Sequence, residues 1–117
     1  MKFAVESSAP PIDISSRDWA EVLRILREQV PDIEVWVFGS RTKRTAKPYS
    51  DLDLALITRE PLSLQQLAAI SDAFAISDLP MRVDLVDWAA TSETFRAIIE
   101  RDKVMIASGR PDARALR

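Results

Sequence analysis

Apolar and polar positions along the chain follow two different periods, which indicates alternating helices and strands. In three segments apolar residues recur every three to four positions, and the first two begin with a capping signature. Helices are predicted at residues 15–29, 63–78 and 92–101. β-Branched, aromatic and alternating apolar residues occupy the intervals between them. Strands are predicted at residues 33–38, 51–56 and 81–86, and the apolar run at 104–106 could form one more.

The order of these elements predicts the fold class. Helix, strand, strand, helix, strand and helix in succession predict an α/β (α+β) fold, with a small mixed β-sheet flanked by helices. The connection from the second to the third strand is long enough to join parallel neighbours by a right-handed crossover. One domain is expected at 15–107, preceded by a loosely held arm at 1–14 that contains two consecutive prolines and followed by a flexible tail at 108–117.

The composition limits the chemistry that this domain can perform. The chain has 117 residues, 47% of them apolar and 29% charged, which is enough for one domain with its own core. It contains no Cys and no His, so disulfides, thiolate zinc sites, cysteine nucleophiles and imidazole bases are excluded. With only two Gly, it cannot build the glycine-rich loops of P-loop or dinucleotide-binding proteins. Acid–base or metal chemistry must therefore use carboxylates.

Charge and hydropathy bear on partners and location. The net charge of −2 argues against a general binder of nucleic acids or membrane surfaces, so neither direct nucleic-acid binding nor a membrane partner is expected. No apolar run approaches the ~20 residues of a membrane span, and Glu6 and two prolines occur where a signal peptide would be apolar. We therefore expect a cytoplasmic location.

Two of the predicted strands carry acidic residues in a pattern that suits a metal site. Asp51 and Asp53 are two positions apart, so their side chains leave the same face of a strand with Cα atoms ~6.6 Å apart. If the third strand is a parallel neighbour, Asp84 can lie beside this pair. Carboxylates select Mg²⁺ or Mn²⁺, and two such ions ~3.5–4 Å apart can clamp the oxygens of an in-line phosphoryl or nucleotidyl transfer. The alternative is an exposed edge with solvated acids.

The acids occur in a sequence context that has known counterparts. The pattern consists of a strand followed by Gly39-Ser40, then after ten residues Asp51-Leu52-Asp53-Leu54, and on a later strand Val83-Asp84-Leu85. It resembles the nucleotidyltransferase superfamily of DNA polymerase β type. The short chain and the run from Phe38 to Leu54 are similar to minimal nucleotidyltransferase (MNT) proteins, which are often encoded beside HEPN-domain partners. The resemblance covers nearly the whole predicted domain and implies the polymerase β-like nucleotidyltransferase fold.

The resemblance implies roles for individual residues. Asp51, Asp53 and Asp84 would be catalytic metal ligands for Mg²⁺ or Mn²⁺, and Asp84 could also take the acceptor's proton. ATP would be the nucleotide donor. A glycine lets backbone N–H groups approach phosphate oxygens closely, and a serine hydroxyl adds a donor. The residues expected to bind the nucleotide are Gly39, Ser40, Arg41 and Ser50.

Some of these assignments have alternatives. Arg41 directly follows the turn, and its planar guanidinium can bind two phosphate oxygens at once, so we expect a phosphate fork there. For Lys43 and Lys47 in the same basic loop, a solvated role is the stronger expectation. Asp87 competes with Asp84 for the third acidic position. Asp84 is preferred because it has apolar neighbours on both sides, whereas Asp87 begins a loop, where Asp is more often a helix cap.

The function implied by the resemblance is enzymatic. We expect a metal-dependent nucleotidyltransferase that transfers AMP from ATP to a tyrosine of a partner HEPN toxin and so acts as its antitoxin. A hetero-oligomer is expected, because 117 residues leave no room for the acceptor-binding domain of larger relatives. One alternative is a catalytic subunit that modifies a small molecule such as an antibiotic, bound by a separate subunit. Another is a non-catalytic antitoxin that acts by binding its partner.

Overall fold

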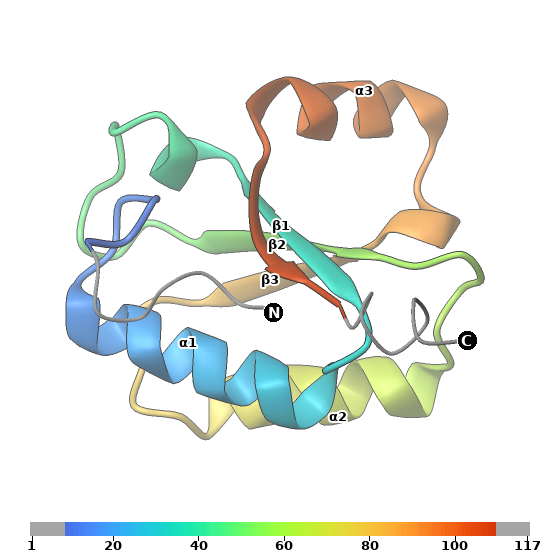
Figure 1. The fold of residues 1–117 in the computed structure, drawn as a ribbon, viewed down its shortest axis with the longest axis horizontal. Coiled ribbons are helices and arrows are strands. Elements are labelled where there is room, and N and C mark those ends of the chain that lie inside the picture. Colours follow the sequence, from blue (N-terminus) through green and yellow to red (C-terminus); the bar gives the residue numbers. More distant parts are fainter. Residues whose placement is uncertain (1–8, 110–117) are drawn as a thin grey trace.

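The computed structural model describes residues 9–109, which form one sheet with helices on both faces (Figure 1). The α-helices are α1 (Ser16–Gln29), α2 (Leu64–Ala75) and α3 (Glu93–Asp102). Two 3₁₀ helices are η1 (Ser40–Thr42) and η2 (Trp88–Ala90). The strands are β1 (Glu34–Phe38), β2 (Leu52–Ile57), β3 (Val83–Asp87) and β4 (Val104–Ser108).

The predicted elements are confirmed, including the fourth strand. The second helix ends at Ala75, before the predicted residue 78, because the Ser77 N–H and hydroxyl both turn back to the carbonyl of Phe74. Within the described range, no helix has the length and apolar character needed to span a bilayer.

The sheet is mixed, as the element order predicts. Its strand order is β3-β2-β1-β4, with β1 antiparallel to both β2 and β4 and with β3 parallel to β2. Helix α2 lies in the connection between the two parallel strands. This topology places the start of β3 beside the start of β2 and leaves β3 at an edge of the sheet.

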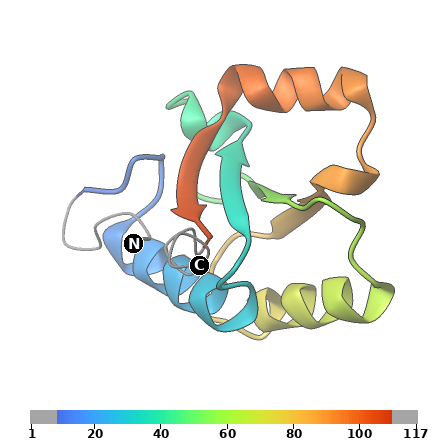
Figure 2. The same ribbon diagram turned by 45° about the vertical axis from the view of Figure 1, so that its right-hand side comes forward.

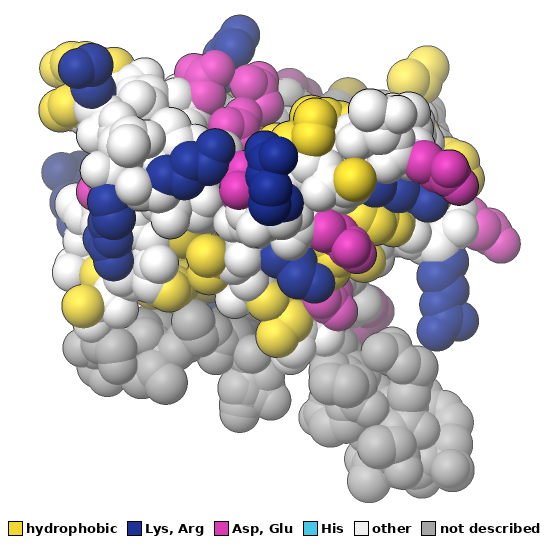
Figure 3. All heavy atoms as spheres, turned by 90° about the horizontal axis from the view of Figure 1, so that it is seen from above, with side chains coloured by type: hydrophobic (Ala, Val, Ile, Leu, Met, Phe, Trp, Pro, Cys, Tyr) yellow, Lys and Arg dark blue, Asp and Glu magenta, His cyan; other side chains and the backbone are white. Residues whose placement is uncertain are grey.

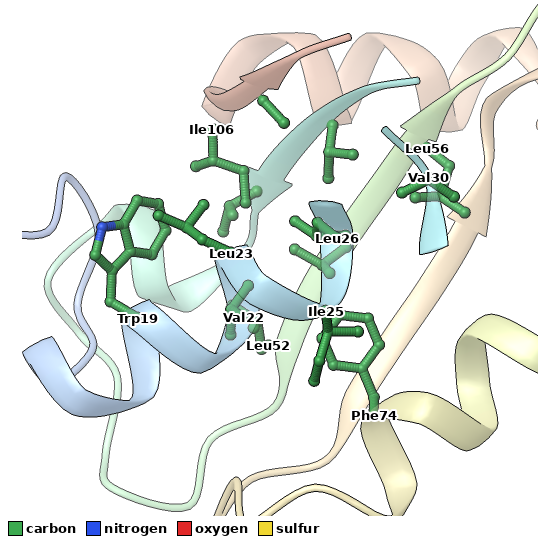
Figure 4. Close-up of a cluster of buried hydrophobic side chains, with 14 of the residues drawn as sticks. Trp19, Val22, Leu23, Ile25, Leu26, Val30, Leu52, Leu56, Phe74 and Ile106 are labelled. Atoms are coloured by element: carbon green, nitrogen blue, oxygen red, sulfur yellow. The ribbon is translucent and has the colours of Figure 1, made fainter. Parts of the chain in front are cut away.

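Helices α1 and α2 cover one face of the sheet and enclose the main core (Figure 1). α1 begins after Ser15, whose side chain accepts a hydrogen bond from the Asp18 N–H, and α2 begins with a capping box between Ser63 and Gln66. The apolar side of α1 is fully buried against the sheet (Figure 4). Its core residues are Trp19, Val22, Leu23, Ile25 and Leu26. Removing this apolar surface from water is the main force that holds the helices in place.

A smaller core lies on the other face of the sheet, under α3 (Figure 2). Trp36 and Phe38 of β1 are buried there together with Ile99 of α3. Trp36 and Trp88 meet edge to face with ring centroids 5.1 Å apart, a favourable aromatic geometry. The α3 side of the sheet therefore has its own small apolar core, and β2 and β3 carry polar residues on this face outside that core.

The ordered domain begins earlier than the sequence predicts. Ile12, assigned to the loosely held arm, is 1% exposed and belongs to the main core, and the Asp13 N–H donates to the Arg41 carbonyl at 2.7 Å. The two prolines before Ile12 favour the prediction of a loosely held arm, and a single apolar residue after them gives no pattern that would indicate its burial. At the other end, β4 reaches Ser108, the first residue of the predicted tail. Residues 1–8 and 110–117 of the predicted arm and tail lie outside the described residues.

Candidate active site

The three predicted acids lie together near one end of the sheet. Asp53 in β2 is the direct register partner of Asp84 in β3, and adjacent strands are ~4.8 Å apart. Leu52 and Leu54 are buried in the main core, so the alternation of side chains directs Asp51 and Asp53 toward the opposite face. Figure 3, viewed from the α3 side, shows acidic side chains gathered beside Lys and Arg side chains at one edge of the molecule. The parallel pairing that the acid cluster required is therefore present.

Gly39 brings the end of β1 into close contact with these acids. It has φ +86°, and a Cβ atom built there would lie 2.5 Å from the Asp53 Oδ2 atom. Both the positive φ and the lack of space require glycine at this position. Ser40 follows as the first residue of η1. The predicted phosphate turn and the predicted metal ligands are therefore neighbours in space.

Arg41 does not form the predicted phosphate fork. Its side chain is 4% exposed, and its guanidinium donates hydrogen bonds to main-chain carbonyls alone among the described residues. The closest contacts run from Nη1 to the Asp13 oxygen at 2.6 Å and from Nη2 to the Ser50 oxygen at 2.7 Å. A guanidinium whose donors are mostly taken up by main-chain carbonyls has little capacity left to bind a phosphate. Arg41 instead joins the two ends of the basic loop to the segment before α1.

The rest of the basic loop is ordered by its own contacts. The Ser50 Oγ accepts a hydrogen bond from the Lys47 N–H at 2.9 Å, and the Ser50 N–H donates to the Lys47 carbonyl at 3.0 Å. Lys43 Nζ lies 3.1 Å from the Asp102 Oδ2 at the end of α3, although a solvated role was the stronger expectation for Lys43. The loop therefore holds Ser50, a predicted nucleotide-binding residue, directly before Asp51.

Arg82, which the sequence did not single out, interacts directly with the acids. Its Nη2 lies 2.7 Å from the Asp51 Oδ2 and 3.4 Å from the Asp84 Oδ2. Arg82 is two residues before Asp84, so the strand period places both side chains on one face, and this spacing could have identified it. A positively charged fork therefore lies between two of the three predicted metal ligands.

The two acids of the Asp51-Leu52-Asp53 motif have opposite electrostatic environments. The hydrogen bond from Arg82 lowers the pKa of Asp51. Burial raises the pKa of Asp53, and the negative charges of Asp84 and Asp51 add to this effect. The charge on Asp53 is therefore unfavourable in this arrangement unless a cation comes close to it.

Asp87, the competing third acid, serves a different purpose. It pairs with Leu56 in the sheet register, three positions along β3 from Asp84. Its buried carboxylate accepts hydrogen bonds from the Thr58 hydroxyl and, at 2.7 Å, from the Leu62 N–H. Asp87 thus fixes the connection between β2 and α2 and lies away from Asp53.

The oxygen atoms of the three carboxylates suit a hard divalent cation, but the three side chains do not lie close enough together to coordinate one ion. In residues 9–109, no three His, Cys, Asp or Glu side chains come close enough together to hold a metal ion. Asp53 and Asp84 pair across β2 and β3, and Asp51 directly precedes β2. Three neighbouring carboxylates, one of them with a raised pKa, are nevertheless the chemistry that Mg²⁺ or Mn²⁺ selects. The guanidinium of Arg82 bridges Asp51 and Asp84, as a small cation would.

The fold and the site together define a nucleotidyltransferase. The chain belongs to the Nucleotidyltransferase domain family, whose profile matches residues 20–111. It is 53% identical over 100 residues to the probable protein adenylyltransferase MntA of Haemophilus influenzae, a match that covers 86% of this chain and 88% of that protein.

Solved structures share the fold. A toxin–antitoxin crystal structure with AMP-PNP matches with a TM-score of 0.66 and 23% identity, over 80% of this chain and 75% of that chain. A complex of the tri-AMPylated Shewanella oneidensis HEPN toxin with its MNT antitoxin matches with a TM-score of 0.63 and 19% identity, over 87% of this chain and 79% of that chain. At these identities the likeness shows a common fold, in agreement with the nucleotidyltransferase fold predicted from the sequence.

Proposed function

We propose that this chain is a protein adenylyltransferase that transfers AMP from ATP to a tyrosine hydroxyl of a HEPN-domain toxin and thereby acts as its antitoxin. The observation that carries the proposal is the grouping of Asp51, Asp53 and Asp84 beside the turn at Gly39. The name of the H. influenzae relative supports a protein acceptor, and the complexes among the structural neighbours support a HEPN partner.

The acids are proposed to hold Mg²⁺ or Mn²⁺. A divalent ion would neutralise charge on the phosphates of ATP and favour ionisation of the attacking hydroxyl. Asp53 benefits most from such an ion, because burial and two neighbouring carboxylates raise its pKa and make its charge unfavourable without one. Asp51 and Asp84 would hold the same ion with Asp53, once they no longer contact Arg82.

The proposed reaction exchanges one bond to phosphorus for another. The phenolic oxygen of the acceptor attacks the α-phosphorus of ATP, the bond to the bridging oxygen breaks, and pyrophosphate leaves with the electron pair. The phenol proton needs a base, and the chain contains no His or Cys. Asp84 accepts it in this proposal, because its side chain is 43% exposed and can return the proton to solvent.

The turn at Gly39 and Ser40 is proposed to hold the triphosphate. Without a Cβ, Gly39 lets the backbone approach phosphate oxygens, and Ser40 adds a hydroxyl donor. The Ser50 hydroxyl accepts from the Lys47 N–H and keeps its own proton to donate to a phosphate oxygen. Arg41 contributes indirectly, by fixing the carbonyl of Ser50 and hence the end of the loop.

Transfer of label from ATP to the purified toxin tests this function. Label should enter the toxin from ATP labelled at the α-phosphorus and not from ATP labelled at the γ-phosphorus, because the adenylyl group alone is transferred. Asp72→Asn removes an exposed carboxylate from α2, outside the proposed site, and should keep the labelling. Transfer of the γ-label, or a toxin that stays unlabelled with both forms of ATP, would contradict the proposal.

A further inference from the structure

We propose that Arg82 is a built-in counter-cation of the active site, which competes with the divalent ion for Asp51 and Asp84 and must leave before the ion can bind. The inference rests on the proposed metal-dependent function and adds a residue to it. Arg82 is then a positioning residue: it keeps the carboxylates together in the metal-free protein and sets how readily they accept an ion.

The contacts of the guanidinium support this role. One nitrogen, Nη2, reaches both the Asp51 Oδ2 at 2.7 Å and the Asp84 Oδ2 at 3.4 Å. The Arg82 carbonyl accepts a hydrogen bond from the Leu52 N–H at 2.9 Å, which fixes its backbone beside the start of β2. The head group therefore lies between the same two carboxylates that a metal ion would have to bring together.

The side chain is also able to leave. Arg82 is 72% exposed and directly precedes the edge strand β3, and exposed ion pairs contribute little net stability because water screens them. Arg41 provides the contrast within the same site, since it is buried and donates to several carbonyls. One arginine is thus held as part of the scaffold, whereas the contacts of the other side chain among residues 9–109 are with the acids.

This competition has a consequence for metal affinity. An ion that binds the acids must displace Arg82, so part of its attraction to the carboxylates is offset by the lost ion pairs. Without Arg82, the same carboxylates have no described cation between them and bind an ion more tightly. The metal-free protein should then lose stability, because three neighbouring carboxylates repel one another without a partner.

Titration of the metal-free full chain with Mn²⁺, followed by electron paramagnetic resonance, tests the inference without any measurement of activity. Arg82→Gln should bind Mn²⁺ about three- to tenfold more tightly than the wild type, as expected for the loss of exposed competing ion pairs. Arg59→Gln makes the same charge change at an exposed position beyond the far end of β2 and should bind like the wild type. Equal or weaker binding by Arg82→Gln would overturn the inference.

Thermal unfolding gives a second, independent readout. In EDTA, Arg82→Gln should melt below Arg59→Gln. At the same excess of Mn²⁺ it should gain more stability, because a ligand stabilises the folded state by RT ln(1 + [L]/Kd) and the site with the lower Kd gains more. An equal gain for both variants would overturn the inference. An Asp51→Asn/Asp53→Asn double variant separates the two proposals: if it binds Mn²⁺ as the wild type does, the metal site itself fails, whereas unchanged binding by Arg82→Gln alone removes only the role of Arg82.

Discussion

At the scale of single residues, Asp51 and Asp53 show how strongly local environment separates two chemically identical side chains. Asp51 reaches the guanidinium of Arg82, which lowers its pKa, whereas burial and two negative neighbours raise the pKa of Asp53. The fold therefore tolerates the Asp53 charge at a cost that a bound cation would remove.

Asp53→Asn should raise the melting temperature of the metal-free protein at pH 7, by about 1–4 °C after allowance for solvent screening. A carboxyl with a raised pKa in the folded state destabilises the fold at high pH, and this penalty falls as the pH falls and disappears below about pH 4, where both states are protonated. The advantage of the variant should therefore shrink as the pH falls. Melting curves in EDTA check this, and an unchanged or lower melting temperature at pH 7 would contradict it.

Arg41→Lys should destabilise the protein by about 1–3 kcal/mol, because an ammonium at this buried position cannot make all the hydrogen bonds that the guanidinium donates to main-chain carbonyls. Urea unfolding measures the change. Arg59→Lys, at an exposed position, is the matched control and should stay within about 0.5 kcal/mol of the wild type. If both variants unfold like the wild type, Arg41 does not fasten the loop as described.

The sequence predicts acidic residues more readily than arginine partners. Asp51, Asp53 and Asp84 could be grouped from strand period and element order, because an Asp pair in a strand is unusual and few other residues could do the chemistry. The roles of Arg41 and Arg82 depend on which oxygens lie within reach of a long side chain. For Arg41 these oxygens belong to segments as distant as Asp13, so local patterns could not identify its role, whereas the two-residue spacing of Arg82 and Asp84 was a local signal.

At the scale of the elements, the site depends on the register between β2 and β3 and on the turn that ends β1. Periodicity predicts the strands and the parallel crossover, but not the register that pairs Asp53 with Asp84. The composition makes Gly39 notable, since the chain has two glycines. Its contact with the Asp53 carboxylate follows from the pairing of Phe38 with Asp53 across β1 and β2.

Gly39→Ala should destabilise the fold and also abolish nucleotide transfer, because the added Cβ forces Asp53 away from its position. Gly109→Ala is a matched control at a second positive φ of +78°, where the nearest atom is the Asp32 carbonyl oxygen at 3.0 Å. The control should lose about 1 kcal/mol or more of stability but retain transfer by the folded fraction. Transfer by Gly39→Ala at the control's rate would show that the close contact is not needed.

At the scale of the whole molecule, the two faces of the sheet have different roles: one mainly stabilises the fold, and the other also carries the proposed catalytic residues. The face under α1 and α2 holds the large apolar core, whereas the α3 face carries a smaller core and the acids. The element order was enough to predict this mixed sheet. The anchoring of Ile12 was not predicted, because a single apolar residue after two prolines has no period to indicate that it is buried.

The central claim is that this chain inactivates a partner toxin by transferring AMP with the help of Asp51, Asp53 and Asp84. Intact mass spectrometry of the purified toxin, after incubation with this chain, ATP and Mg²⁺, tests it most directly. The wild type should add about 329 Da, or a multiple of it, to the toxin, the mass of an adenylyl group transferred to an acceptor hydroxyl. Asp51→Asn, which is nearly isosteric but lacks the charge, should add nothing. Two results together would contradict the account and indicate an antitoxin that acts by binding alone. These are an unchanged toxin mass with the wild type, and an Asp51→Asn variant that protects cells from the toxin as well as the wild type does.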